Sequence, residues 1–137
     1  MSELDRNKAV VRRFNERVIE ALDEAAFRDL MAPGFVNHSA PPGAPTGADG
    51  MWNTFANVLH PAFPDLRVTI EDQVAEGDKV VTRKTIAGTH RGALMGIAPT
   101  GRAVSISVID IVRIEDGRYA EHWGVNTLPA VLAQLRG

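Results

Sequence analysis

The sequence predicts an α+β fold in which several helices are followed by an antiparallel sheet. Two observations predict it: apolar residues recur at helical spacing up to residue 59, and from Leu66 onward they alternate with polar residues at the period of a strand. Helices that precede a run of consecutive strands are typical of a sheet with helices packed on one face. The 137 residues suffice for one domain, which we expect to span residues 1–137.

Three helices are predicted in the first half of the chain. The first spans residues 3–22, where apolar residues form one stripe and Ser2 with Asp5 forms a capping box. A short second helix follows and is expected to end at the Pro-Gly pair 33–34. After a proline-rich segment that forbids regular structure, a third helix is predicted over residues 51–59.

Four strands and a last helix are predicted in the second half. Residues 66–75 and 79–90 alternate and are joined by a tight turn. A glycine-rich loop leads to a strand over residues 104–114, which returns through "IEDGRY" into a strand over residues 118–125. Thr127 is then expected to cap a C-terminal helix.

Composition narrows the class of partner. The net charge is −2 and basic residues are dispersed among acidic ones, so no footprint for nucleic acid or anionic lipid is visible. There is no cysteine, which fits a reducing compartment, and the N-terminal segment has neither a signal-peptide core nor a membrane span. We expect a cytoplasmic protein whose partner is a small molecule or another protein.

Asp110 is the residue that first suggests a site. It lies in a strand row with Val108 and Val112, where its neighbours are apolar. An ionised carboxylate in such a row costs about several kcal/mol of stability unless it is paired or hydrogen-bonded. It is either a satisfied structural acid or an acid or base in a pocket, because perturbed carboxylates concentrate at functional sites.

The link between the last two strands decides what faces Asp110. A two-residue turn would place it opposite Trp123, and a three-residue loop would place it opposite His122. We favour the three-residue loop because Gly117 occupies its third position, where a left-handed residue is needed. On that register Asp110, His122 and Gly124 share one face. An Asp–His pair can fix an imidazole tautomer and move a proton near neutral pH, although a structural ion pair is the alternative.

Four further residues are candidates for binding a substrate. His90 ends a strand beside the glycine-rich loop and could bind a substrate oxygen, or could simply be a polar strand end. His38 could reach the pocket or cap a turn. Trp52 and Phe55 could stack on a flat ligand, although core packing is the commoner use of such a pair. The histidines are too far apart in sequence to form a local metal site, so no metal is expected.

The segments "FVNHSA", "FPDL", "GTHRGALMGIAPTGR" and "IDIVRIEDGRYAEHW" resemble the SnoaL-like polyketide cyclase (ester cyclase) family of the NTF2-like superfamily. The resemblance covers about residues 7–135. It implies a cone-shaped barrel, with a curved antiparallel sheet and helices on its concave face enclosing a pocket, and commonly a homodimer built on the sheet. It also implies acid–base chemistry without cofactor or metal on polyketide-like or oxygenated cyclic compounds, the best-known reaction being an intramolecular aldol cyclisation.

The resemblance also marks two departures at the site. In the aldol cyclases of this family, the catalytic aspartate is expected at the position of Gly124 and a histidine at that of Asp110. We therefore interpret Asp110 and His122 as a relocated catalytic pair, with His38, His90, Trp52, Phe55 and Gly124 contacting substrate. An isomerase, an epoxide-opening enzyme and a binding protein without turnover are the alternatives.

Overall fold

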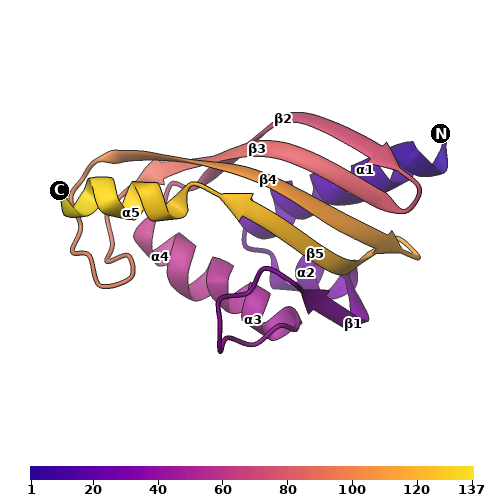
Figure 1. Cartoon of the computed structure of the whole chain (residues 1–137), viewed down its shortest axis with the longest axis horizontal. Helices are drawn as coiled ribbons and strands as arrows, with labels where there is room; N and C mark the ends of the chain where they lie inside the picture. Colours follow the sequence, from indigo (N-terminus) through magenta and orange to yellow (C-terminus); the bar gives the residue numbers. More distant parts are fainter.

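A computed structural model describes residues 1–137 (Figure 1). Its helical segments and strands follow in this order: α1 (Glu3–Arg13), η1 (Phe14–Glu20), α2 (Glu24–Leu30), β1 (Met31–Asn37), α3 (Ala48–Asn53), η2 (Thr54–Leu59), α4 (His60–Ala62), β2 (Arg67–Glu76), β3 (Lys79–Thr89), β4 (Ala103–Glu115), β5 (Arg118–Asn126) and α5 (Leu128–Arg136). The α+β prediction is confirmed.

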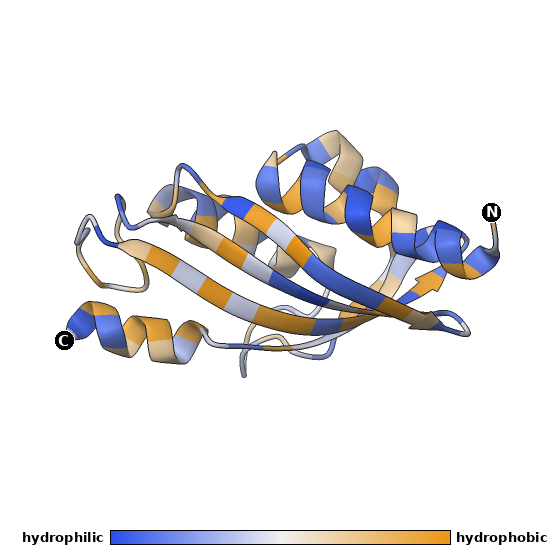
Figure 2. Ribbon diagram, turned by 90° about the horizontal axis from the view of Figure 1, so that it is seen from above, coloured by the Kyte–Doolittle hydropathy of each residue, from blue (hydrophilic) through white to orange (hydrophobic).

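The five strands form one curved sheet in the order β1-β5-β4-β3-β2. Figure 2 shows the N-terminal helices stacked on one face of this sheet, whereas α5 lies apart from them near the C-terminus. Because β1 and β2 are not paired with each other, the sheet stays open at both edges. The concave face of the sheet and the helices that cover it therefore enclose the interior in which a site can be buried.

The prediction of a purely antiparallel sheet is wrong at one edge. Residues 31–37 form β1, which pairs in parallel with β5, although the Pro-Gly pair at 33–34 was expected to end the second helix. Proline is tolerated on an edge strand, and the pairing of β1 is interrupted between Met31 and Val36, where the Pro-Gly pair lies. This short strand brings Asn37 beside His122.

The first helix runs as predicted but changes pitch. Ser2 Oγ accepts a hydrogen bond from the Asp5 backbone N–H at 3.1 Å, which confirms the predicted cap. After Arg13 the helix widens into the π-helical turns of η1, and the third predicted helix does the same in η2. Wider turns of this kind are often found at functional sites, and η1 carries the buried residue Asn15.

The hairpin between β4 and β5 follows neither predicted register. Asp116 and Gly117 form a two-residue turn with φ of 52° and 74°, as in a type I′ hairpin. A bulge at Ala120 then shifts the pairing by one residue, so that Asp110 lies opposite Gly124 and His122 lies opposite Val112. Because 122 and 124 are still on the face of Asp110, the predicted proximity survives. Tyr119 lies opposite Ile114, on the face of Asp110.

The core lies between the helices and the concave face of the sheet. Phe14 is at its centre, stacked on Tyr119 with ring centroids 4.1 Å apart and tilted against Phe27. The strands alternate in hydropathy along their length (Figure 2), as expected for a sheet with one covered face. None of the helices combines the length and the apolar character needed to cross a membrane.

Candidate active site

Five polar side chains form a continuous row of polar contacts across the covered face of the sheet. Lys84 Nζ donates to Asn15 Oδ1 at 2.8 Å and to Asp110 Oδ2 at 3.1 Å. The same Oδ2 lies 3.4 Å from His122 Nε2, and His122 Nδ1 lies 2.9 Å from Asn37 Oδ1. These contacts therefore link η1, β3, β4, β5 and the end of β1.

The polar side chains of this network are unusually deeply buried. Asn15, Lys84 and Asp110 are 1%, 4% and 5% exposed. A buried charge is tolerated when it is paired, and Lys84 gives Asp110 an opposite charge while Asn15 binds a second ammonium proton. Asn15 is itself held by a bond from its Nδ2 to the Val11 carbonyl at 2.8 Å. The carboxylate predicted in an apolar row is thus a member of a buried polar network.

The charges around Asp110 determine its ionisation. Burial raises the pKa of this carboxyl, but the neighbouring Lys84 ammonium and His122 outweigh that effect and hold the pKa below its ordinary value. Asp110 is therefore an anion at neutral pH. Its second oxygen, Oδ1, is buried and has no hydrogen-bond partner, so this carboxylate keeps one free acceptor.

His122 is oriented by the segment that follows β1. The His38 backbone N–H donates to the His122 carbonyl at 2.8 Å, and the Gly124 N–H donates to Ser39 Oγ at 2.7 Å. Asn37 binds the imidazole itself. The side chain of His122 is 16% exposed, compared with 6% for that of Asp110, so the imidazole is the more accessible member of the pair.

Gly124 leaves the space in which the imidazole lies. A Cβ at this position would be 3.1 Å from His122 Cε1, 3.3 Å from His122 Nε2 and 3.3 Å from the Asp110 Cβ. All three distances are shorter than ordinary van der Waals contacts. A side chain at residue 124 would therefore require His122 or Asp110 to shift by a few tenths of an ångström.

Tyr119 lies on the same face and remains neutral. Its burial, with a smaller contribution from the Asp110 charge, raises the pKa of the phenol well above 10.0. With a neutral phenol, the charges of the buried network are those of Lys84, Asp110 and, when protonated, His122. With a neutral imidazole these groups carry no net charge, and protonation of the imidazole gives a net charge of +1 beside the Asp110 carboxylate.

Comparison with known families now identifies the group to which this arrangement belongs. A model of the SnoaL-like polyketide cyclases matches residues 9–135. The chain belongs to the SnoaL-like polyketide cyclase family. The resemblance seen in the sequence is thereby confirmed, and the family's fold matches the α+β architecture described above.

Solved structures of the same fold extend this result. TsrD from Streptomyces laurentii is 29% identical, with 98% of each chain covered and a TM-score of 0.85. IdmH from Streptomyces antibioticus, described as a candidate polyketide cyclase, is 32% identical over 96% of this chain and 99% of its own, with a TM-score of 0.82. An LEH-like epoxide hydrolase from M. tuberculosis is 15% identical with a TM-score of 0.72, a likeness of fold alone. No curated protein sequence matches the chain.

The side chain of His38, which was expected to contact substrate, lies away from the Asp110–His122 pair. Its ring stacks on Trp123 with centroids 4.8 Å apart, and its Nε2 lies 2.9 Å from Glu121 Oε1. Trp123 and Glu121 are on the face of β5 opposite to Asp110, because successive strand residues point to opposite faces. The backbone of His38 supports His122, whereas its side chain lies outside the covered face.

His90 is also separated from the pair. It is fully buried and lies eight residues beyond Thr82, the residue opposite Asp110, which corresponds to about 26 Å along a strand. Its Nδ1 accepts a hydrogen bond from the Thr100 backbone N–H at 3.2 Å, and its ring is tilted against Phe63. In the structure the His90 side chain holds the glycine-rich loop through Thr100.

Trp52 and Phe55 pack in the core. Trp52 contacts Phe27 with ring centroids 5.1 Å apart, and Phe55 contacts Phe14 at 6.0 Å in an edge-on arrangement. The alternative that was left open for this pair, packing rather than ligand stacking, describes their contacts in the structure.

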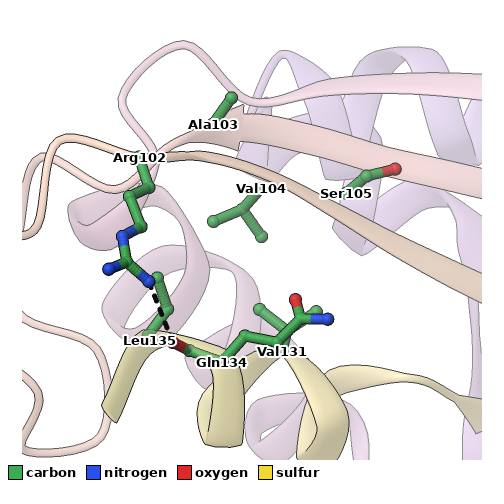
Figure 3. A pocket seen from close by; sticks show the side chains of 7 residues that line it. All are labelled: Arg102, Ala103, Val104, Ser105, Val131, Gln134 and Leu135. Carbon is green, nitrogen blue, oxygen red and sulfur yellow. Dashed lines mark hydrogen bonds between the residues drawn. The ribbon is translucent and has the colours of Figure 1, made fainter. Parts of the chain in front are cut away.

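A groove lies elsewhere, between the start of β4 and α5. Figure 3 shows its side chains, with the Arg102 guanidinium donating to the Gln134 carbonyl at 3.0 Å. The groove has a volume of about 550 Å³ and includes Val104, which is six residues from Asp110 along β4, or about 20 Å. It is therefore distinct from the buried network. No group of three or more His, Asp or Glu side chains is arranged to hold a metal ion.

Three members of the network were missed in the sequence. Lys84 occurs in the period-two row of Val80, Thr82 and Ile86. The alternation that drew attention to Asp110 therefore also places a cation on the covered face of the neighbouring strand. Asn15 and Asn37 gave no comparable signal. Asn15 is buried because of the π-helical pitch of η1. Asn37 lies at the end of β1, a strand that was not predicted because it contains a proline and a glycine.

Proposed function

We propose that this protein is a cofactor-independent acid–base enzyme that removes a proton next to a carbonyl group of a polyketide-like compound and so closes a ring by an intramolecular aldol reaction. The observation that carries the proposal is the buried Lys84–Asp110–His122 network. It places an imidazole beside a carboxylate that stays ionised, on the covered face of a SnoaL-like fold. Membership of the family supports the substrate class.

The reaction needs a group that accepts a proton from carbon. The Asp110–His122 pair takes that proton, and the electron pair of the broken C–H bond forms an enolate. The enolate carbon then attacks a second carbonyl carbon of the same molecule, which forms the new C–C bond. The pair returns the proton to the resulting alkoxide, so the protein ends in its starting state.

A base at this pair replaces the aspartate that aldol cyclases of the family are expected to have at residue 124. Glycine at 124 has no acid to offer, but it leaves room for the His122 imidazole against Asp110. The acid–base function is therefore moved within β4 and β5 rather than lost. The contact between His122 and the ionised Asp110 supports an enzyme over a protein that binds without turnover.

Deuterium exchange tests the proposal. Polyketide-like ketones and diketones are incubated in D₂O with the wild type, Asp110→Asn, His122→Gln and, as a matched control on the exposed turn, Asp116→Asn. We expect mass spectrometry to show exchange next to the carbonyl with the wild type and Asp116→Asn and a loss of roughly 10²-fold or more with the other two variants. Binding of these ketones without any exchange by the wild type would favour the binding-protein alternative.

We also propose that the enzyme is a cytoplasmic homodimer built on the exposed face of the sheet. Two adjacent cross-strand pairs there, Ile109–Val125 and Ile111–Trp123, are apolar, and Ile109 and Val125 are 47% and 71% exposed. Large apolar side chains gathered on one exposed face are typical of a protein interface. The absence of cysteine supports a reducing compartment.

A further inference from the structure

We infer that Asn37 fixes the tautomer of His122, so that Nδ1 keeps its proton in both charge states and Nε2 is the nitrogen that gains and loses one. This inference rests on the proposed function and deepens it, because it assigns His122 as the base and Asp110 as the anion that stabilises the protonated imidazole. Asn37 is a positioning residue in this scheme.

The orientation of the Asn37 amide is set by a second hydrogen bond. The Ser39 backbone N–H donates to Asn37 Oδ1 at 3.0 Å. A backbone N–H can only donate, so the atom facing it is the amide oxygen and not the amide nitrogen. His122 Nδ1 lies 2.9 Å from the same oxygen, which accepts and cannot donate. Nδ1 must therefore carry a proton.

The backbone holds the two side chains in this arrangement. Asn37 and His122 are paired residues of β1 and β5. Just beyond this pair, the His38 N–H donates to the His122 carbonyl and the Gly124 N–H donates to Ser39 Oγ. Rotating the imidazole would give up the bond to Asn37. A ring turned by 180° would also place carbon atoms where Nδ1 and Nε2 now face Asn37 and Asp110. The surrounding contacts therefore favour one ring orientation.

The remaining nitrogen faces Asp110. His122 Nε2 lies 3.4 Å from Asp110 Oδ2, and that oxygen is also bound by Lys84. When Nε2 accepts the proton of a substrate C–H bond, the electron pair of that bond stays on the substrate as an enolate and the new imidazolium lies against a carboxylate. The Lys84 ammonium favours the ionised form of that carboxylate, and the His122 side chain is more exposed than that of Asp110.

The test is a long-range ¹H–¹⁵N correlation spectrum of protein labelled at the histidine nitrogens. The His122 signals are assigned by their absence in His122→Gln, and the spectrum is recorded at alkaline pH, where the ring is neutral. We expect the wild type to show a protonated Nδ1 and an unprotonated Nε2. A spectrum in which Nε2 carries the proton of the neutral ring overturns the inference, whatever the variants do.

Three variants separate tautomer control from general support of the fold. Asn37→Asp keeps an acceptor and should retain the wild-type pattern, whereas Asn37→Leu removes the acceptor and should lose the strong preference for Nδ1–H. Asn57→Leu makes the same change on an exposed helical residue and should alter nothing. An unchanged tautomer in folded Asn37→Leu would overturn the role of Asn37. If Asn37→Leu fails to fold, Asn37→Ala removes the same acceptor with a smaller side chain and decides the role of Asn37.

A kinetic measurement separates this inference from the proposed function. Exchange by Asn37→Leu should fall by roughly tenfold to a hundredfold, with ketone binding little changed, and Asn37→Asp should recover much of the rate. If the wild type has the expected tautomer but exchanges no ketone, the proposed function fails and the tautomer assignment stands. If it exchanges ketones with the proton on Nε2, the proposed function stands and this inference fails.

Discussion

Asp110 illustrates how a residue can be identified from sequence while its setting cannot. The alternation of β4 placed this carboxylate on the covered face, and the structure leaves it 5% exposed. Lys84, the cation that makes this burial tolerable, lies on a strand far away in sequence, so its contact depends on the pairing of β3 with β4. Period-two patterns give the face of a residue but not its partner across the sheet.

Replacing Lys84 with Met should reverse the direction in which the contribution of Asp110 to folding stability changes with pH. In the wild type the pKa of Asp110 is lowered, so its contribution to stability is present above the pKa of the unfolded chain and is lost as pH falls through the folded pKa. In Lys84→Met burial remains without the cation and should raise that pKa. The buried carboxylate then keeps only its contact with His122 and should cost up to about 3–5 kcal/mol at neutral pH.

Urea unfolding at several pH values measures this reversal. The difference in unfolding free energy between wild type and Lys84→Met should be largest at pH 7 and should narrow as pH falls towards about 4, the ordinary range for a carboxyl group. Lys79→Met, which removes an exposed cation 3.6 Å from Asp78, is the matched control and should change little. A constant difference at every pH would mean that Lys84 does not control the charge of Asp110.

A methyl group at residue 124 should act as a wedge between His122 and Asp110. Gly124→Ala places a Cβ within 3.3 Å of both side chains, while the backbone at 124 needs no left-handed conformation. We expect the Nε2 to Oδ2 contact to lengthen, the imidazole signals in NMR spectra to shift, and stability to fall by about 1–3 kcal/mol. Exchange activity should fall with the lost contact.

The control for this wedge is another glycine. In Gly34→Ala the new Cβ meets nothing within 4 Å, so His122 signals and exchange should match the wild type. Wild-type activity and unchanged imidazole signals in Gly124→Ala would show that the imidazole does not need the space above residue 124.

The β4–β5 hairpin shows what the sequence leaves undecided at the level of an element. Either turn length is compatible with "IEDGRY", and the register also depends on the bulge at Ala120, which no turn rule predicts. Asp110 and His122 end on one face because a two-residue turn followed by one extra residue has the same parity as the predicted three-residue loop. The predicted proximity was right, although the predicted pairing was wrong.

The turn makes a testable demand on its glycine. Gly117 has a φ of 74°, a conformation that costs a residue with a side chain about 1–2 kcal/mol. Gly117→Ala should lower stability by that amount in chemical denaturation, while exchange activity is retained because the pairing of β4 with β5 stays in place. Asp116→Asn keeps a residue type that tolerates a left-handed conformation and should be neutral. Equal stability of Gly117→Ala and wild type would argue against this turn.

At the scale of the whole molecule the architecture was predictable because its signals are local. Helical and strand periods gave the order of most elements, and the family resemblance gave the curved sheet with helices on one face. Packing decided the remainder. The parallel edge strand β1 gave no periodic signal, and the side chains of His38 and His90 were separated from the site by strand parity and by distance along β3.

The exposed face of the sheet can be tested as the dimer interface. If Ile109 and Val125 lie in a dimer interface, changing either to Asp places a charge in a desolvated apolar contact and should convert the protein to a monomer in sedimentation equilibrium. Both side chains point away from the Asp110 face, so the monomer should stay folded with its buried network intact. Met95→Asp makes the same change at an exposed residue of the glycine-rich loop and should leave the dimer unchanged. A wild type that is monomeric at all concentrations would rule out the proposed dimer. A dimer that tolerates both sheet substitutions would place the interface on another surface.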